Sequence, residues 1–205
     1  PTTSVPPEVA DCSSVGQSSD MDVRVKKIDF NNNGMEHSTF GDDNSWFPFE
    51  EIEAEIEVRG DGNFDADNVE VFWGLWDTDR NEWVIEPDSE KDFRLKHDDS
   101  ETLTVTFKVD DNVDMDLADI TDGNHYKFYA YAEGVVDDND SPNDGADFCV
   151  SSSEDAEVVV ENNFVVLDNF QIPETVQCGA NVQVSADVWN IGSDDQDSVS
   201  VDVYD

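Results

Sequence analysis

The chain has 205 residues, of which 51 are Asp or Glu and only 10 are Lys or Arg, so its formal net charge is −41. A chain this acidic has no basic stripe to meet phosphate groups, which excludes nucleic acid as a partner and disfavours an anionic membrane surface. No stretch approaches the roughly 18 apolar residues of a membrane-spanning helix, so no transmembrane segment is expected.

Aromatic residues are plentiful despite this charge: the chain contains 12 Phe, 5 Trp and 4 Tyr. A disordered acidic segment would be poor in such side chains, so we expect a folded protein with an acidic surface. That surface has two interpretations. It adapts the protein to high salt, where a Debye length of about 3 Å at 1 M screens self-repulsion, or some of its carboxylates bind divalent cations.

Residues 1–20 are rich in Pro, Thr and Ser and show almost no apolar periodicity, which predicts a flexible N-terminal arm. The segment has neither the basic start nor the apolar run of a signal peptide. A mature secreted protein and a cytosolic protein would both begin in this way, so this feature leaves the compartment open.

Residues 21–162 alternate between apolar and polar side chains, the pattern of half-buried β-strands. The first strand runs from Val23 to Phe30 with a bulge in it. In residues 52–58 Glu separates the apolar positions, so we expect one buried face and one face of carboxylates. Further strands are expected at 69–75, 83–85, 93–95 as an edge, 103–109, 126–131 and 158–160. Only residues 111–123 could hold a helical turn, so the pattern predicts an all-β, antiparallel β-sandwich.

The end of the chain repeats part of this pattern. Residues 188–192 (VWNIG) match residues 58–62 (VRGDG), and Val199 and Val201 match Val69 and Val71. A repeat at this interval predicts tandem domains of one type. We expect the second domain to span 163–205 with about three strands, too few for a stable sandwich without further strands.

One motif carries a family likeness. It consists of Ala186, Val188, Asn190 and Gly192, and the segment PETVQCG precedes it. These residues resemble the CARDB-type immunoglobulin-like modules of bacterial and archaeal cell-surface proteins, in which Asn-x-Gly forms a turn after a strand. Gly60 stands where the first copy would need the Asn. The acidic composition with tandem modules is also similar to archaeal S-layer proteins. The resemblance implies tandem immunoglobulin-like β-sandwich domains, the second incomplete, that serve in adhesion or structural spacing without catalysis.

Three cysteines are present, none in a CxxC pair or near a His, so a zinc site is not expected. A bridge between Cys12 and Cys149 would fasten the arm to the first domain and contribute roughly 5 kcal/mol in the chain-entropy model. Cys178 is then left over, either free or with a partner beyond residue 205 or in another chain. The alternative is that all three are small buried apolar residues.

Three loops place Asp and Asn at the alternate spacing that supplies oxygen ligands to Ca²⁺, although none matches an EF-hand. The alternative interpretation is that these carboxylates are simply solvated. A further loop residue, Asn139, begins an Asn-Asp-Ser triplet that fits N-glycosylation. The candidate metal ligands are Asp61, Asn63, Asp65 and Asp67, then Asp110, Asp114 and Asp116, then Asp137, Asp140 and Asp144.

Nothing in the sequence selects a catalytic pair, because carboxylates are everywhere and the three histidines are dispersed, so we predict no enzyme. The aromatic groups 46–49 and Phe72, Trp73 and Trp76 are candidates either for stacking on sugars or for packing within and between domains. We therefore expect a secreted, self-associating cell-surface structural protein. The alternatives are an extracellular filament subunit completed by strand donation from the arm 1–20, or a carbohydrate-binding adhesin that contacts envelope glycans.

Overall fold

The computed structural model describes residues 5–12, 23–32, 45–60, 64–109, 120–137, 144–173, 175, 177–179 and 181–202. The described part is mostly β-strand with one short helix, as the alternation predicts an all-β protein. Its elements are α1 (Pro7–Cys12), β1 (Val23–Asn32), β2 (Ser45–Trp46), β3 (Glu51–Gly60), β4 (Asp65–Asp77), β5 (Glu82–Leu95), β6 (Ser100–Lys108), β7 (Gly123–Asp137), β8 (Asp147–Val158), β9 (Val165–Gln171) and β10 (Ser185–Asn190).

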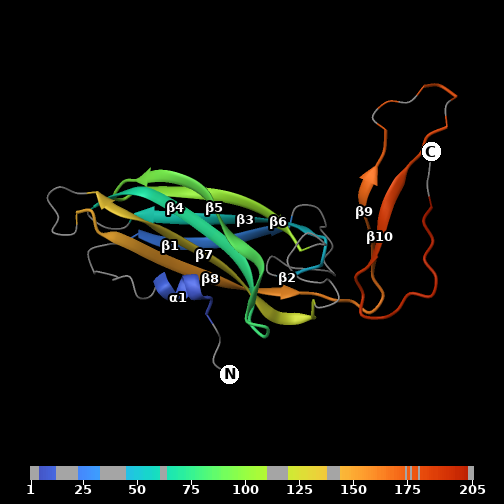
Figure 1. Ribbon diagram of the computed structural model, residues 1–205, viewed down its shortest axis with the longest axis horizontal. Coiled ribbons are helices and arrows are strands. Elements are labelled where there is room, and N and C mark those ends of the chain that lie inside the picture. Colours follow the sequence, from blue (N-terminus) through green and yellow to red (C-terminus); the bar gives the residue numbers. More distant parts are fainter. Residues whose placement is uncertain are drawn as a thin grey trace.

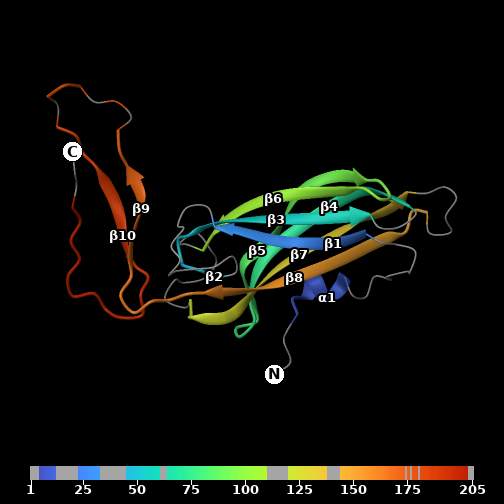
Figure 2. The same ribbon diagram turned by 180° about the vertical axis from the view of Figure 1, so that it is seen from behind.

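Two sheets stack face to face and form a β-sandwich (Figures 1 and 2). One sheet has three strands in the order β1-β3-β6, and the other has five in the order β2-β8-β7-β4-β5. All pairings are antiparallel except that of β2 with β8, which is parallel. The predicted edge strand at 93–95 belongs to β5, which lies at the edge of the larger sheet. The predicted bulge in the first strand is confirmed between Val25 and Lys27.

The apolar residues that alternate along β3 and β4 fill the core between the two sheets. On β3 the apolar residues from Ile52 to Val58 are at most 1% exposed, and on β4 the residues Val69, Val71 and Leu75 are fully buried. Aromatic rings complete the centre of the core: the ring of Phe107 lies 5.5 Å from that of Trp73 and 5.6 Å from that of Phe128, centroid to centroid. Such offset aromatic pairs stabilise a core beyond the area that they bury.

The opposite face of β3 presents glutamates to solvent, as predicted. Glu55 is exposed, and Glu53 and Glu57 are half-buried. The neighbouring strand β6 places Thr104 directly opposite Glu55 in the antiparallel register. The acidic face of this sheet is therefore interleaved with hydroxyl groups along one side, which spaces the carboxylates apart.

The N-terminal arm is not wholly flexible, which corrects the expectation for residues 1–20. Residues 7–12 form the short helix α1, which packs on the outer face of the five-stranded sheet beside β8 (Figure 1). Its residues Val9 and Cys12, three positions apart, both face the sheet and are buried. Cys12 forms a disulfide with Cys149 of β8, with the two Cα atoms 4.8 Å apart.

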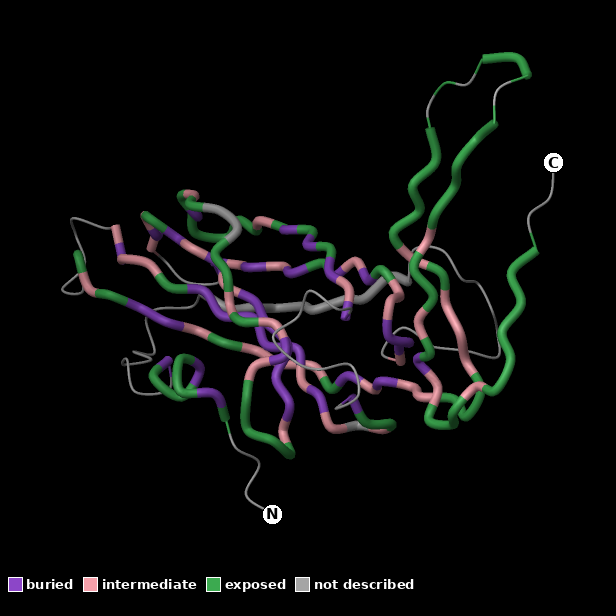
Figure 3. The backbone as a smooth tube through the Cα atoms, turned by 45° about the vertical axis from the view of Figure 1, so that its right-hand side comes forward, coloured by how far each residue is buried: buried purple, intermediate pink, exposed green. Residues whose placement is uncertain are grey.

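The strands β9 and β10 form a separate two-stranded antiparallel hairpin at one end of the sandwich, beyond β2 (Figures 1 and 2). The predicted strand at 199–201 is absent: residues 191–202 contain no strand, and Val199 and Val201 are about half exposed. The physical reason is that, within the part of the chain that the structure describes, no strand pairs with these residues. Figure 3 shows the contrast between the striped burial of the sandwich and the largely exposed hairpin.

Candidate functional site

A defined set of backbone hydrogen bonds closes the base of the hairpin, next to the sandwich. We call the two segments involved, residues 161–164 and 191–194, the joint. The amides of Ile191 and Gly192 both donate to the carbonyl of Phe164, at 3.0 and 3.1 Å. The amide of Ser193 donates to the carbonyl of Glu161 at 2.9 Å, and that of Asp194 to the carbonyl of Asn162 at 2.9 Å. The chain that leaves β10 is therefore tied to the chain that leaves the sandwich.

The Asn-x-Gly sequence singled out above lies within the joint. The Asn190 Oδ1 atom accepts a hydrogen bond from the Gly192 amide at 3.2 Å, and its Nδ2 atom donates to the Asp194 carbonyl at 3.0 Å. A Cβ atom at Gly192 would lie 2.6 Å from the Phe164 amide nitrogen and 2.7 Å from the Asn162 carbonyl oxygen. Only glycine permits this close approach of two backbone segments. The motif thus shapes the joint.

Side chains from the corner between β2 and β3 complete the contact. The Phe47 and Phe164 rings lie 5.0 Å apart, and those of Phe49 and Trp189 lie 5.4 Å apart, centroid to centroid. At the end of β6, the Lys108 Nζ atom forms an ion pair with the Asp168 carboxylate at 3.1 Å. The sequence did not reveal these pairings, because each joins a residue before position 110 to one after position 160.

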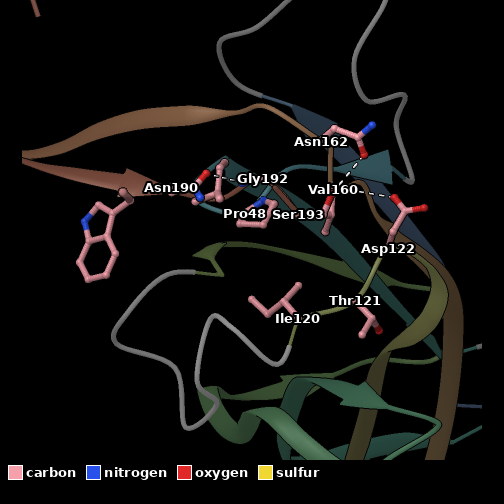
Figure 4. Close-up of a pocket in the computed structure, with 11 residues that line it drawn as sticks. Pro48, Ile120, Thr121, Asp122, Val160, Asn162, Asn190, Gly192 and Ser193 are labelled. Atoms are coloured by element: carbon pink, nitrogen blue, oxygen red, sulfur yellow. Dashed lines mark hydrogen bonds between the residues drawn. The ribbon is translucent and has the colours of Figure 1, made fainter. Parts of the chain in front are cut away.

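A cavity of about 800 Å³ lies beside the joint (Figure 4). Its polar lining is largely engaged: the Asn162 Oδ1 atom accepts from the Ser193 hydroxyl at 3.1 Å, and the Asp122 Oδ1 atom accepts from the Val160 amide at 2.9 Å. Among the described residues, the buried Trp189 Nε1 atom has no hydrogen-bond partner. The cavity therefore has the character of a gap at a structural joint. It is lined by Pro48, Ile120, Thr121, Asp122, Val160, Asn162, Trp189, Asn190, Ile191, Gly192 and Ser193.

Three of the predicted metal ligands do come together, but around an arginine. The Arg94 guanidinium pairs with Asp65 at 3.2 Å and with Asp67 at 3.3 Å, and it also contacts Asp137. Asp65 and Asp67 lie at the start of β4, and Asp137 lies at the end of β7. The antiparallel register places these two strand ends side by side. A guanidinium supplies the positive charge that a cation would otherwise bring.

The electrostatics of this cluster follow from its donors. The His97 backbone amide and ring donate to the Asp65 carboxylate, and together with Arg94 they hold the pKa of Asp65 below its usual value. The charges of Asp67 and Asp137 in turn raise the pKa of Arg94. All of these side chains are partly open to solvent, so the cluster is a surface ion network and adds little to stability.

Of the other predicted ligands, the structure describes only Asp144, which does not join this cluster. Asp144 is exposed, on a different turn. Among the residues that the structure describes, no group of three or more His, Cys, Asp or Glu side chains has a geometry suited to a metal ion. Calcium binding stays a prediction. Thermal unfolding at fixed high salt, with and without a chelator, tests it, and equal midpoints would count against it. Outside the described residues lie Asp61, Asn63, Asp110, Asp114, Asp116, Asp140 and the glycosylation candidate Asn139.

The aromatic residues considered for sugar stacking make aromatic contacts within the protein, which is the packing alternative, and sugar binding stays a prediction. Trp46 is 1% exposed and contacts the Phe107 ring at 5.3 Å, so it belongs to the core. Phe72 stacks on Tyr131 at 4.8 Å, and Trp76 packs edge-on against Trp83 at 5.0 Å. Both pairs lie on the outer face of the five-stranded sheet, in the cluster that includes Val9 and Cys12 of α1.

Comparison with known proteins gives only distant likenesses. No family model matches the chain, and no curated protein matches it. Among solved structures, the C-terminal domain of wzt is 10% identical with a TM-score of 0.43, over 69% of this chain and 76% of that one. Spo0M, a sporulation control protein from Bacillus subtilis, is 12% identical with a TM-score of 0.32, over 82% and 68%. Both scores are too low to bear on function. No helix among the described residues is long and apolar enough to cross a membrane.

Proposed function

We propose that this chain is a structural module of a cell-surface protein, built from immunoglobulin-like sandwich domains of the CARDB type and acting as a spacer in an envelope or S-layer. One observation supports this most directly. The base of the hairpin is closed by four backbone hydrogen bonds, and it is held end-on against the sandwich by two aromatic pairs and the Lys108–Asp168 ion pair. A connection built in this way holds two modules at a fixed distance, which is the physical requirement of a spacer.

The surface chemistry agrees with an exposed, salt-rich setting. The exposed side of β3 presents Glu51 and Glu55, and the formal charge of the chain is −41. The positive charges are few, and Arg94 and Lys108 each already face carboxylates. Repulsion between carboxylates destabilises a compact state in dilute buffer and is screened in concentrated salt.

The alternative functions lose part of their support. Strand donation by the arm 1–20 is disfavoured because residues 7–12 form a helix that a disulfide holds on the chain's own sheet. A sugar-binding adhesin is disfavoured because the aromatic residues proposed for it are packed. Self-association and contact with envelope glycans stay predictions for the surface of the spacer.

The test is surface labelling of intact cells that make the protein. A membrane-impermeant amine reagent, applied in growth-strength salt, should label this protein to the extent that it labels a known envelope protein. A cytoplasmic protein from the same cells serves as the control for intactness. Labelling no greater than that of the cytoplasmic control would overturn the proposal. Recovery as a free soluble monomer from the medium alone would also argue against an envelope role.

A further inference from the structure

The hairpin exposes a continuous apolar face. The antiparallel register places Leu167 opposite Val188, and alternation along β10 puts Ala186 on the same side as Val188. Val184 and Val182, which precede β10, continue the same spacing of two. Five apolar side chains of this face have exposed fractions between 45% and 63%, and Leu167 adds 36%. Isolated apolar residues on a surface are ordinary, but a contiguous group marks a contact surface. The exposed group consists of Leu167, Phe170, Ile172, Val182, Val184 and Val188.

This face matches the inner face of the first sandwich position by position. The repeat that aligns Val188 with Val58 also aligns residues 182, 184 and 186 with Ile52, Ala54 and Ile56. In β3 these four residues are at most 1% exposed. Their partner strand agrees as well, since β9 pairs antiparallel with β10 and has one irregularity in register, as β1 does with β3. The hairpin therefore repeats the β1–β3 pair and presents the residues of a core, and no second sheet covers them among the described residues.

The first sandwich also indicates what covers such a face. After β3 the chain crosses to the opposite sheet, where Val69 and Val71 of β4 are fully buried against it. The repeat places Val199 and Val201 at the corresponding positions. Both are about half exposed, in a segment that follows the joint and runs extended beside the hairpin (Figure 1). The chain thus already contains residues suited to the first strand of a covering sheet.

Charge argues for this occupant over a second copy of the hairpin. Residues 164–202 contain seven Asp or Glu residues and no Lys or Arg. Two copies placed face to face would bring like charges together along every rim, which is unfavourable at a contact. In the first sandwich, by contrast, the covering strands belong to the same chain, and the glutamates of β3 lie on the face away from the core.

We infer that the apolar face of β9–β10 is half of the core of a second sandwich, and that it is covered by an opposing sheet of the same polypeptide whose first strand is formed by residues 198–202. This inference rests on the proposed function, because it supplies the second module that the spacer joins. In the covered state Val199 and Val201 lie against Val184 and Val188, as Val69 and Val71 lie against β3.

The experiment uses cysteine accessibility in the protein purified from the cells that make it. In a Cys178→Ser background, Val188→Cys places a thiol on the apolar face and Asp187→Cys places one on the other face of the same strand. We expect a bulky maleimide to modify Val188→Cys at least tenfold more slowly than Asp187→Cys. Equal rates would overturn the inference, and so would protection that disappears on dilution, which would identify a second copy as the occupant.

A second measurement avoids substitution in the apolar face. Hydrogen exchange of the unmodified protein should show protected amides at 199–201, because a strand in a sheet holds its amides in hydrogen bonds. Exchange as fast as that of the exposed loop around Gly179 would contradict the inference. Neither result depends on where the protein resides, so surface labelling and face accessibility can fail independently.

Discussion

The sandwich and the hairpin begin from the same arrangement and end in opposite states. β3 with β1, and β10 with β9, are antiparallel pairs whose apolar residues alternate in the same positions. Ile56 and Val58 of β3 are fully buried, whereas Val188 of β10 is 49% exposed. The difference is the five-stranded sheet that covers one pair and not the other. Alternation thus specifies which face of a strand is apolar, and only a second layer turns that face into a core.

Truncation of an aromatic side chain should separate the two regions by the largest difference in the free energy of unfolding. Phe128→Ala in the sandwich removes a fully buried ring that stacks with Trp73 and Phe107, and should lower the free energy of unfolding by about 3–5 kcal/mol. Phe170→Ala in the hairpin removes a ring that is 59% exposed, and should change it by about 0.5 kcal/mol or less. Urea unfolding of the 205-residue chain followed by Trp fluorescence measures both. Similar losses for the two variants would contradict the distinction.

The disulfide should stabilise the sandwich and leave the hairpin unaffected. Cys12→Ser with Cys149→Ser opens a loop whose ends are 137 residues apart, and should lower the stability by about 2–5 kcal/mol. It also releases α1 from the aromatic cluster on the outer sheet. Calorimetry of the double variant, with the exposed Cys178→Ser as the matched control, measures the effect. A control that loses as much stability as the double variant would exclude this bridge as the cause.

Gly192→Ala should loosen the connection between the two regions. The added Cβ would lie 2.6 Å from the Phe164 amide nitrogen, so the joint must open at a cost of about 1–3 kcal/mol. We expect the sandwich itself to keep its melting temperature while the hairpin moves more freely. Small-angle scattering of the variant measures its maximum dimension and flexibility, with Ser193→Ala as a control that keeps the backbone contact. An unchanged scattering profile would show that the joint does not hold the hairpin rigidly.

These regions also divide what sequence could predict from what it could not. The strands, the bulge near Val25 and the acidic face of β3 follow from periodicity, because each depends on neighbours in the chain. The environment of Trp46 did not follow, since its burial depends on Phe107, which lies in a strand of the opposite sheet. The helix at 7–12 was missed because it is short and depends on packing against β8, although the three-residue spacing of Val9 and Cys12 was a weak signal.

The candidate site was predicted only in its local part. Asn190 and Gly192 were identified because a turn motif is contained in five residues. The contacts that hold the hairpin against the sandwich, Phe164 with Phe47 and Asp168 with Lys108, join distant segments and have no local pattern. The same reason explains Arg94: the spacing of Asp65 and Asp67 suggested a cation, and the fold supplied a guanidinium from β5.

High pH should weaken the sandwich through Tyr131 on the outer face. Burial, with the nearby charges of Glu133 and Glu8, raises the pKa of Tyr131 from 10.0 to about 12. Below pH 10 the phenol is neutral in both states and its contribution is complete; above pH 10 the unfolded chain ionises first, so stability falls until about pH 12. Tyr131→Phe keeps the ring on Phe72 and should lose less stability over this range. Urea midpoints at pH 9 to 11.5 measure it, and parallel curves for the two proteins would exclude Tyr131.

The smallest expected effect concerns the ion pair across the joint. Lys108 and Asp168 are each about a quarter exposed, so a double-mutant cycle of Lys108→Ala and Asp168→Ala should give a coupling energy of about 0.2–1 kcal/mol. The Debye length falls to about 3 Å at 1 M salt, so the coupling should shrink there while the aromatic pairs keep the hairpin attached. The cycle is measured by urea unfolding in dilute and in molar salt. A coupling that is equal in both would mean that Lys108 acts through its packing over the Phe49 ring, 5.4 Å from the centroid, more than through its charge.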